Sequence, residues 1–123
     1  MRHLLATTCL TPAILLSAVG ARAETVVSTA RTTVIATSSA NNGAADSIKI
    51  SSTGSIKPAS GVAVTINSNH AVTNEGTIQI TGANDATGIQ ANAGVSANIV
   101  NSGTITIDEN YTPADPDKDG DND

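Results

Sequence analysis

The acidic end of the chain has the residue types and the spacing of a calcium ligand set. In the sequence DPDKDGDND (residues 115–123), Asp115, Asp117 and Asp119 occupy alternate positions and Gly120 follows them. This is the first half of a D-x-D-x-D-G loop, in which oxygen ligands surround Ca²⁺ and the glycine permits the turn. The residues predicted to hold the ion are Asp115, Asp117, Asp119, Asp121 and Asp123.

The same acidic segment also fits a simpler interpretation. The bidentate carboxylate that closes such a loop does not occur up to Asp123, and Pro116 is unusual inside one. A solvated acidic tail would have the same composition. Calcium is therefore the only candidate cofactor that the sequence predicts, with a solvated tail as the alternative.

The residues that could perform catalysis are few. His70 is the only histidine after residue 23, and the only cysteine, Cys9, precedes it. Neither a G-x-S-x-G motif nor a phosphate-binding loop is present, and no pair of carboxylates is spaced as in a glycosidase. We expect no enzymatic activity. The alternative is a carbohydrate-active β-helix enzyme, in which the acidic residues would cluster on one face; these residues are Asp46, Glu75, Asp85, Asp108 and Glu109.

The first 23 residues, MRHLLATTCLTPAILLSAVGARA, have the three parts of a signal peptide. Arg2 is followed by an apolar stretch that is densest over residues 13–19, and Ala21 and Ala23 precede the predicted cleavage site before Glu24. The stretch is too short for a permanent membrane helix. We therefore predict that this signal peptide directs the chain to the protein export machinery of the cell. The lack of cysteine after cleavage favours a bacterial host.

The composition restricts how a core can be built. The 123 residues include no Phe or Trp and one Tyr, so Ile, Val and Ala must supply the buried area. The formal net charge is −5 and no basic patch is present, which excludes a nucleic-acid partner. Such a composition suits regular stacking of β-branched residues.

An internal repeat predicts how these residues stack. The segment GVAVTINSNHAVTNEGTIQIT (61–81) aligns without a gap with GIQANAGVSANIVNSGTITID (88–108), so that Val62 faces Ile89 and Ile78 faces Ile105. A shorter copy at residues 47–62 places Ile50 opposite Val72. Inward positions and glycines coincide, as expected when only the core and turns are constrained.

The repeats predict short strands and a solenoid. Apolar residues alternate with polar ones in VAVTI and TIQIT, which indicates half-buried strands. We predict an all-β fold, a right-handed parallel β-helix fragment of two to three coils, in which Asn74 and Asn101 hydrogen-bond in a ladder. Gly76 and Gly103 are expected to adopt positive φ. An antiparallel β-sandwich is the alternative.

The stretches VTNEGTIQITG (72–82) and IVNSGTITID (99–108), behind a cleavable leader, resemble the N-terminal part of a bacterial autotransporter passenger domain, a type V secretion substrate. The resemblance implies a β-helical stalk at the cell surface, carried by a C-terminal outer-membrane β-barrel that this sequence lacks. We therefore expect a fragment of a longer protein. The expected organisation is a signal peptide (1–23), an N-terminal cap or flexible lead (24–46), β-helix coils (47–108) and an acidic loop or tail (109–123).

These observations predict a display function. We expect an exported module with a structural or adhesive role, located at the bacterial cell surface or outer membrane, or outside the cell. Its partner would be a surface glycan or a protein. A calcium-dependent secreted binding module is the alternative.

Overall fold

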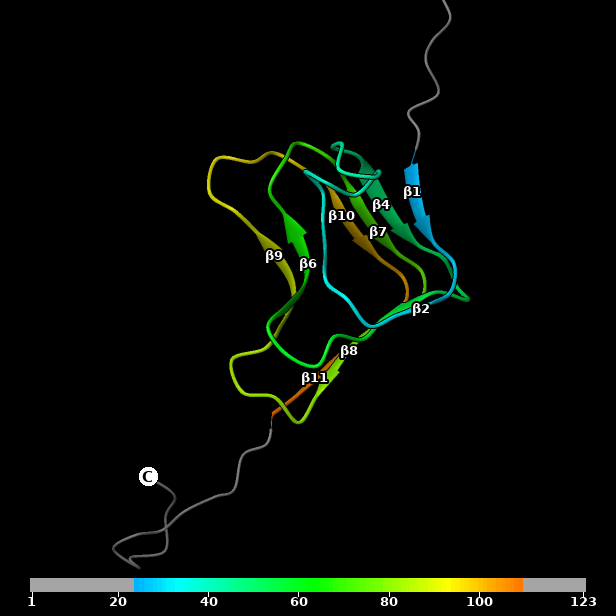
Figure 1. Cartoon of the computed structure of the whole chain (residues 1–123), viewed down its shortest axis with the longest axis vertical. Helices are drawn as coiled ribbons and strands as arrows, with labels where there is room; N and C mark the ends of the chain where they lie inside the picture. The colour runs from blue at the N-terminus through cyan, green and yellow to red at the C-terminus, as the bar shows by residue number, and fades with distance from the viewer. Residues whose placement is uncertain (1–23, 110–123) are drawn as a thin grey trace, which may run out of the picture.

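A computed structural model describes residues 24–109, which contain strands, turns and loops and no helix (Figure 1). Within this part of the chain, no helix has the length and apolarity needed to cross a bilayer. The strands are β1 (Glu24–Val27), β2 (Ala30–Arg31), β3 (Ile35–Ala36), β4 (Ser47–Ile50), β5 (Ser55–Ile56), β6 (Val62–Ile66), β7 (Val72–Asn74), β8 (Thr77–Thr81), β9 (Thr87–Ala91), β10 (Ile99–Asn101) and β11 (Thr104–Asp108).

The strands form three parallel sheets around one axis. Their orders are β1-β4-β7-β10, β11-β8-β5-β2 and β3-β6-β9, so each turn of the chain adds one strand to each sheet. Figure 1 shows β1, β4, β7 and β10 side by side in chain order. This arrangement is a parallel β-solenoid of about three turns and confirms the predicted fold class. The sandwich alternative is wrong, because every pairing between these strands is parallel.

The strongest part of the repeat has the predicted register. In β7 and β10, Val72 pairs with Ile99 and Asn74 pairs with Asn101. In β8 and β11, Ile78 pairs with Ile105. Residues at the same place in successive coils therefore stack on one another, as the alignment requires.

Two other predicted equivalences are wrong. Val62 pairs with Thr87, and it is Val64 that pairs with Ile89. The reason is that the loop at residues 92–98 is longer than the loop at residues 67–71, so a gapless alignment is out of register before it.

The second error lies in the shorter copy. Ile48, rather than Ile50, pairs with Val72, and Ile50 pairs with Asn74. The turn between β4 and β5 is longer than the turn between β7 and β8. Its extra residues bind the coil below, since the hydroxyl of Thr53 donates to the carbonyl of Ser28 at 3.0 Å. A turn of this length cannot be detected from the apolar pattern alone.

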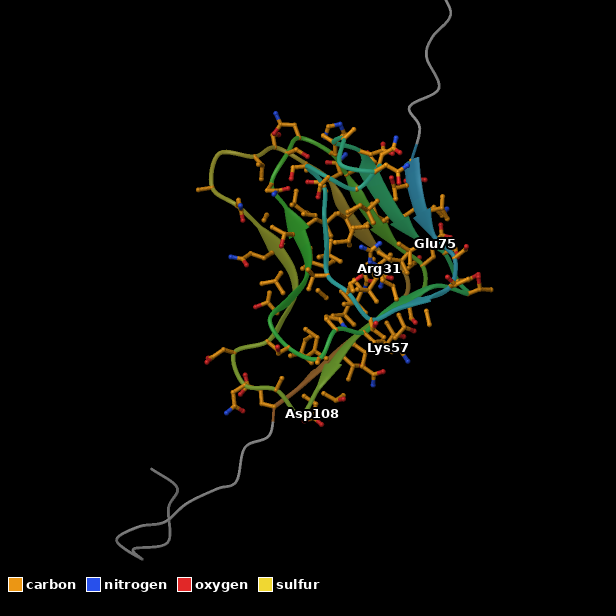
Figure 2. All side chains as sticks on the ribbon, in the orientation of Figure 1. Arg31, Lys57, Glu75 and Asp108 are labelled. Atoms are coloured by element: carbon orange, nitrogen blue, oxygen red, sulfur yellow. The ribbon has the colours of Figure 1, made fainter. Side chains whose placement is uncertain are left out.

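The core is a stack of aliphatic side chains, mostly isoleucine. Ile48, Ile56, Ile78 and Ile80 are completely buried. Because strand side chains alternate between faces, one face of each strand fills the interior of the solenoid and the other faces solvent. Figure 2 shows the charged residues Lys57, Glu75 and Asp108 at the outside of this stack.

The two ends of the solenoid differ. Residues 24–46, for which the sequence offered a cap or a flexible lead, form the first coil, and β1 pairs with β4 along its length. At the other end, β10 and β11 are the last strands of their sheets within residues 24–109. The inward side chain of Ile105 is 39% exposed there, whereas Ile78 one coil below is fully covered.

This difference predicts unequal effects for one substitution made at two places in the same column. Ile78→Ala should lower the free energy of unfolding by about 2–5 kcal/mol, because it leaves a cavity in a closed core. Ile105→Ala should cost less than half as much, because its side chain is already partly in water. Urea unfolding followed by circular dichroism measures both. Equal losses would show that the core does not have this layered arrangement.

Candidate functional site

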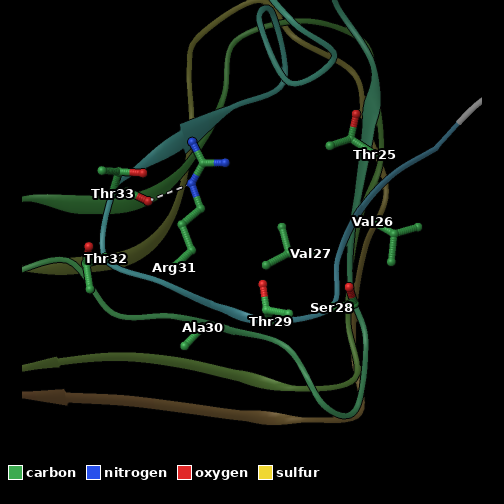
Figure 3. Close-up of a pocket in the computed structure, with 9 residues that line it drawn as sticks. All are labelled: Thr25, Val26, Val27, Ser28, Thr29, Ala30, Arg31, Thr32 and Thr33. Atoms are coloured by element: carbon green, nitrogen blue, oxygen red, sulfur yellow. Dashed lines mark hydrogen bonds between the residues drawn. The ribbon is translucent and has the colours of Figure 1, made fainter.

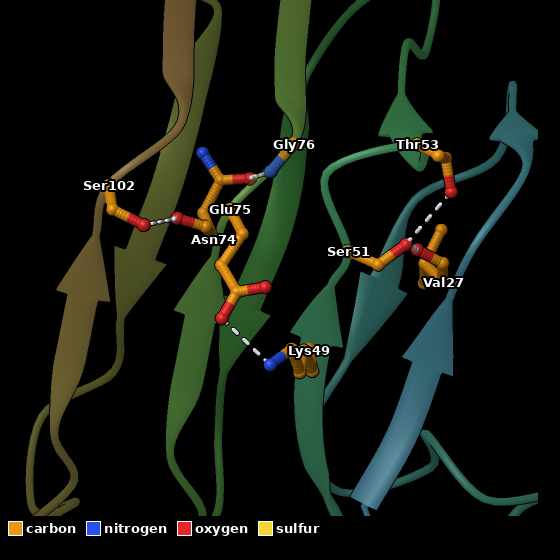
Figure 4. A network of polar contacts seen from close by, with 8 residues as sticks. All are labelled: Val27, Lys49, Ser51, Thr53, Asn74, Glu75, Gly76 and Ser102. Carbon is orange, nitrogen blue, oxygen red and sulfur yellow. Dashed lines mark hydrogen bonds and ion pairs between the residues drawn. The ribbon is translucent and has the colours of Figure 1, made fainter.

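The best-defined polar site is the corner between β7 and β8, shown in Figure 4. Asn74 is fully buried there. Its amide nitrogen donates to the side-chain oxygen of Asn101 at 2.7 Å and to the carbonyl of Thr104 at 3.3 Å. Its side-chain oxygen accepts from the backbone N–H of Gly76 at 3.2 Å. The predicted contact between the two asparagines is confirmed, and it joins successive coils.

The glycines beside this corner are needed for a different reason from the predicted one. Neither Gly76 nor Gly103 has positive φ; Gly43, Gly61, Gly82 and Gly94 do. Instead, a Cβ on Gly76 would overlap the carbonyl oxygens of Gly54 and Ser51, and one on Gly103 would overlap the backbone of Glu75 and Gly76. The glycines therefore stack directly, and the close approach of backbones between coils excludes a side chain.

A surface ion pair crosses the same corner. The Nζ of Lys49 on β4 lies 2.7 Å from a carboxylate oxygen of Glu75. Its hydrogen bond with this carboxylate raises the pKa of Lys49 above its ordinary value. Any stability that this provides is therefore present at neutral pH and is lost as the pH rises past the raised pKa. Glu75 is therefore engaged in a structural contact between two coils.

A second polar corner joins the first and second coils. Thr37 is fully buried. Its hydroxyl accepts hydrogen bonds from the backbone N–H groups of Asn67 and Ser68, both at 3.1 Å, and from the hydroxyl of Ser68 at 2.9 Å. Sequence reasoning did not identify Thr37, because its partners lie about one coil away in the chain and no local pattern marks it.

His70 and Asp46 also form hydrogen bonds beside this second corner. The Nδ1 of His70 lies 3.0 Å from the Ser68 hydroxyl. The carboxylate of Asp46 accepts from the Thr25 hydroxyl at 2.9 Å and from the Ser47 N–H at 2.8 Å. These two candidates for acid–base chemistry are thus engaged in separate turns of the solenoid.

A concavity lies at the N-terminal coil (Figure 3). It has a volume of about 550 Å³ and is lined by residues 25–33. Arg31 and Val27 point into the coil, whereas Val26 points out. The guanidinium of Arg31 donates to the carbonyls of Thr33 at 3.0 Å and Val34 at 3.2 Å. The concavity is therefore the open first layer of the solenoid, partly covered by one arginine.

The predicted calcium ligands, Asp115 to Asp123, lie outside the described residues, as does the predicted signal peptide. Among residues 24–109, no group of three or more His, Cys, Asp or Glu side chains is placed to hold a metal ion. The sites that the structure does define are the corners between coils and the two ends.

No protein-family model matches the chain, and neither a curated protein nor a solved structure matches it. The strand pairing alone therefore establishes the class of protein, a parallel β-solenoid.

The asparagine contact yields a matched pair of variants. Asn74→Ala removes both donors of a buried amide and leaves the Gly76 N–H without its side-chain acceptor, so it should destabilise the protein by about 1–3 kcal/mol. Asn101→Ala removes one acceptor of the Asn74 amide nitrogen, which still donates to the Thr104 carbonyl, and should therefore cost clearly less. Thermal unfolding compares them. If Asn101→Ala costs as much as Asn74→Ala, the bonds of Asn74 to Gly76 and Thr104 contribute nothing to stability and this account of the corner is wrong.

Proposed function

We propose that the protein is an exported β-solenoid display module, of the kind found in the passenger domain of a bacterial autotransporter. The observation that carries the proposal is the stacking of Asn-x-Gly-Thr-Ile-x-Ile coils in parallel register. Its role is structural or adhesive. The scaffold supports this role because the stacked coils present their outward residues at fixed spacing on extended, flat faces.

The outward face is polar and suits a ligand with many hydrogen-bonding groups. On β7, Thr73 faces outward between Lys49 and Val100 of the neighbouring coils. On β8 and β11, Gln79 pairs with Thr106. Hydroxyl, amide and ammonium groups on adjacent strands favour a surface glycan or a polar protein surface as the partner.

The contacts made by the acidic residues favour a display function over enzymatic activity. Glu75 is paired with Lys49, and Asp46 accepts two hydrogen bonds from its neighbours. Asp108 ends β11 on a different sheet from β7, which Glu75 follows. The carboxylates with these contacts hold the coils together, so the proposal assigns them no reaction.

Export is supported by the leader in residues 1–23 and its small residues before Glu24. The proposal places the mature chain at the bacterial cell surface or outside the cell, with an outer-membrane β-barrel as the partner that carries it there. Nucleic acid is not among the proposed partners, because the net charge is −5.

Expression in a Gram-negative host tests export, and binding assays on the exported chain test adhesion. We expect the chain to leave the cytoplasm and its mature N-terminus, read by mass spectrometry, to be Glu24. In the variant Ala23→Arg the leader should remain uncleaved, because a large cationic side chain does not fit the signal peptidase pocket, which accepts small residues. The purified mature chain is then tested on glycan and protein arrays.

Two results would contradict this proposal. Recovery of the uncleaved chain in the cytoplasm, with Ala23→Arg behaving identically, would exclude export. The second result concerns an efficiently exported chain. Adhesion would be excluded if this chain bound no glycan or protein more tightly than a control variant in which the outward residues Thr73 and Thr106 are both replaced by lysine.

Calcium binding by the acidic segment is a separate proposal that rests on its ligand spacing. If Asp115, Asp117 and Asp119 bind the ion, millimolar CaCl₂ should raise the melting temperature and EGTA should reverse the rise. The double variant Asp117→Asn, Asp119→Asn should abolish the shift. An equal shift in the variant, or with MgCl₂ in place of calcium, would identify a nonspecific effect of charge screening on a solvated tail.

A further inference from the structure

A polar groove lies on the side of the solenoid, where the chain enters the sheet formed by β1, β4, β7 and β10. It has a volume of about 270 Å³ and is lined by Ser47, Asn69, Ala71, Ser96, Ala97 and Asn98. None of these residues takes part in the corner at Asn74 or in the concavity of the first coil. The groove is therefore separate from both of those features.

The parallel register builds this groove from three successive coils. Val72 pairs with both Ile48 and Ile99. Because these three residues form one column, the residues that precede them in the chain also stack on one another; they are Ser47, Ala71 and Asn98. Neighbouring strands lie about 4.8 Å apart, so the groove extends about 10 Å along the axis of the solenoid.

A second column forms the other wall of the groove. Asn69 and Ser96 lie at the same place in two consecutive coils, each three residues before the paired residues Val72 and Ile99. The side-chain oxygen of Asn69 accepts a hydrogen bond from the backbone N–H of Ser96 at 2.8 Å. This bond holds the amide in place through its oxygen, so its N–H donors can serve a ligand.

Several backbone groups of the groove are already engaged within the chain. The N–H of Ala71 donates to the hydroxyl of Ser47 at 3.3 Å, and the N–H of Ser96 is bound as described above. The carbonyls of Ala71 and Asn98 each accept an N–H from a neighbouring coil. A peptide strand that adds to a sheet needs unpaired backbone groups. The groove therefore favours a ligand that bonds with side chains.

The side chains of the groove favour a neutral ligand with many hydroxyl groups. None of the six lining residues is charged, so an ionic ligand would lose water without gaining a counter-charge. The serine hydroxyls and asparagine amides can each donate and accept hydrogen bonds. Ala71 and Ala97 are half-buried and supply an apolar surface beside these groups. A sugar ring has the matching features, adjacent hydroxyl groups and an apolar C–H face.

We propose that this groove binds one neutral sugar unit of a surface glycan. The amides of Asn69 and Asn98 bond with its hydroxyl groups, and its C–H face packs on Ala71 and Ala97. The volume is slightly below the 300–1,000 Å³ of sites for drug-sized ligands, which suits a single ring. This inference rests on the proposed adhesive function and deepens it by naming the ligand class and its site.

An NMR titration of the isotopically labelled full chain tests the groove directly. The probes are the methyl glycosides of glucose, galactose, mannose, N-acetylglucosamine and N-acetylgalactosamine. At least one should shift the side-chain amide signals of Asn69 and Asn98 in a saturable manner, with the millimolar Kd expected for so small a ligand. The Kd should change by less than about twofold between low and high salt, because no ion pair forms.

A matched pair of asparagine variants locates the binding site. Asn98→Ala removes a side chain of the groove and should weaken binding about fivefold to tenfold, through the loss of hydrogen bonds to the sugar. Asn84→Ala removes an exposed asparagine between β8 and β9, outside the groove, and should leave the Kd unchanged. Circular dichroism checks that both variants retain the β fold. Equal Kd values for the two variants would overturn the proposal.

The outcomes also separate this inference from the proposed function. Shifts confined to the outward residues Thr73 and Thr106 would place the sugar on the flat faces, which would overturn the groove site and still support adhesion. If no glycoside binds but the chain is retained on a glycan or protein array, the groove site is again wrong and adhesion stands. The absence of binding to both the glycosides and the arrays would contradict both proposals.

Discussion

The structure depends on one interaction, the stacking of equivalent residues in successive parallel coils. No coil is a unit with its own core, because each contributes only one layer of inward side chains. Ile78 is buried because coils lie on both sides of it, and Ile105 in the same column is 39% exposed because, among the residues that the structure describes, a coil lies on one side only. Stability in such a fold is therefore a sum over interfaces between neighbours.

This dependence explains why the corners are so restricted. For aliphatic layers to touch, the backbones of adjacent coils must approach closely where the chain turns, and Gly76 and Gly103 meet this need by having no side chain. Asn74 then satisfies the buried polar groups that the turn creates, through its bonds to Gly76 and the coil above. The Asn-x-Gly motif thus links the turn within a coil to the contact between coils.

Part of this stacking could be predicted from the sequence. Alternation in TIQIT and TITID and their shared spacing predicted the parallel stack and the columns at Ile78 and Ile105, because burial on one face imposes a period of two. The register at Val62 and at Ile50 was wrong, since loop lengths outside the strands leave no apolar signal. Thr37 and Arg31 act through contacts visible only after folding. The calcium ligands and the leader stay predictions, because they lie outside the described residues.

Display on a solenoid requires that the coils be parallel and in this register, since otherwise the outward residues would not form columns. NMR measurement of backbone NOEs tests this requirement most directly. The stack predicts contacts that link Ile78 to Ile105 and Ile78 to Ile56, in the pattern of parallel strands. Close Hα–Hα contacts between antiparallel neighbours, with no contact between Ile78 and Ile105, would contradict the stacked coils.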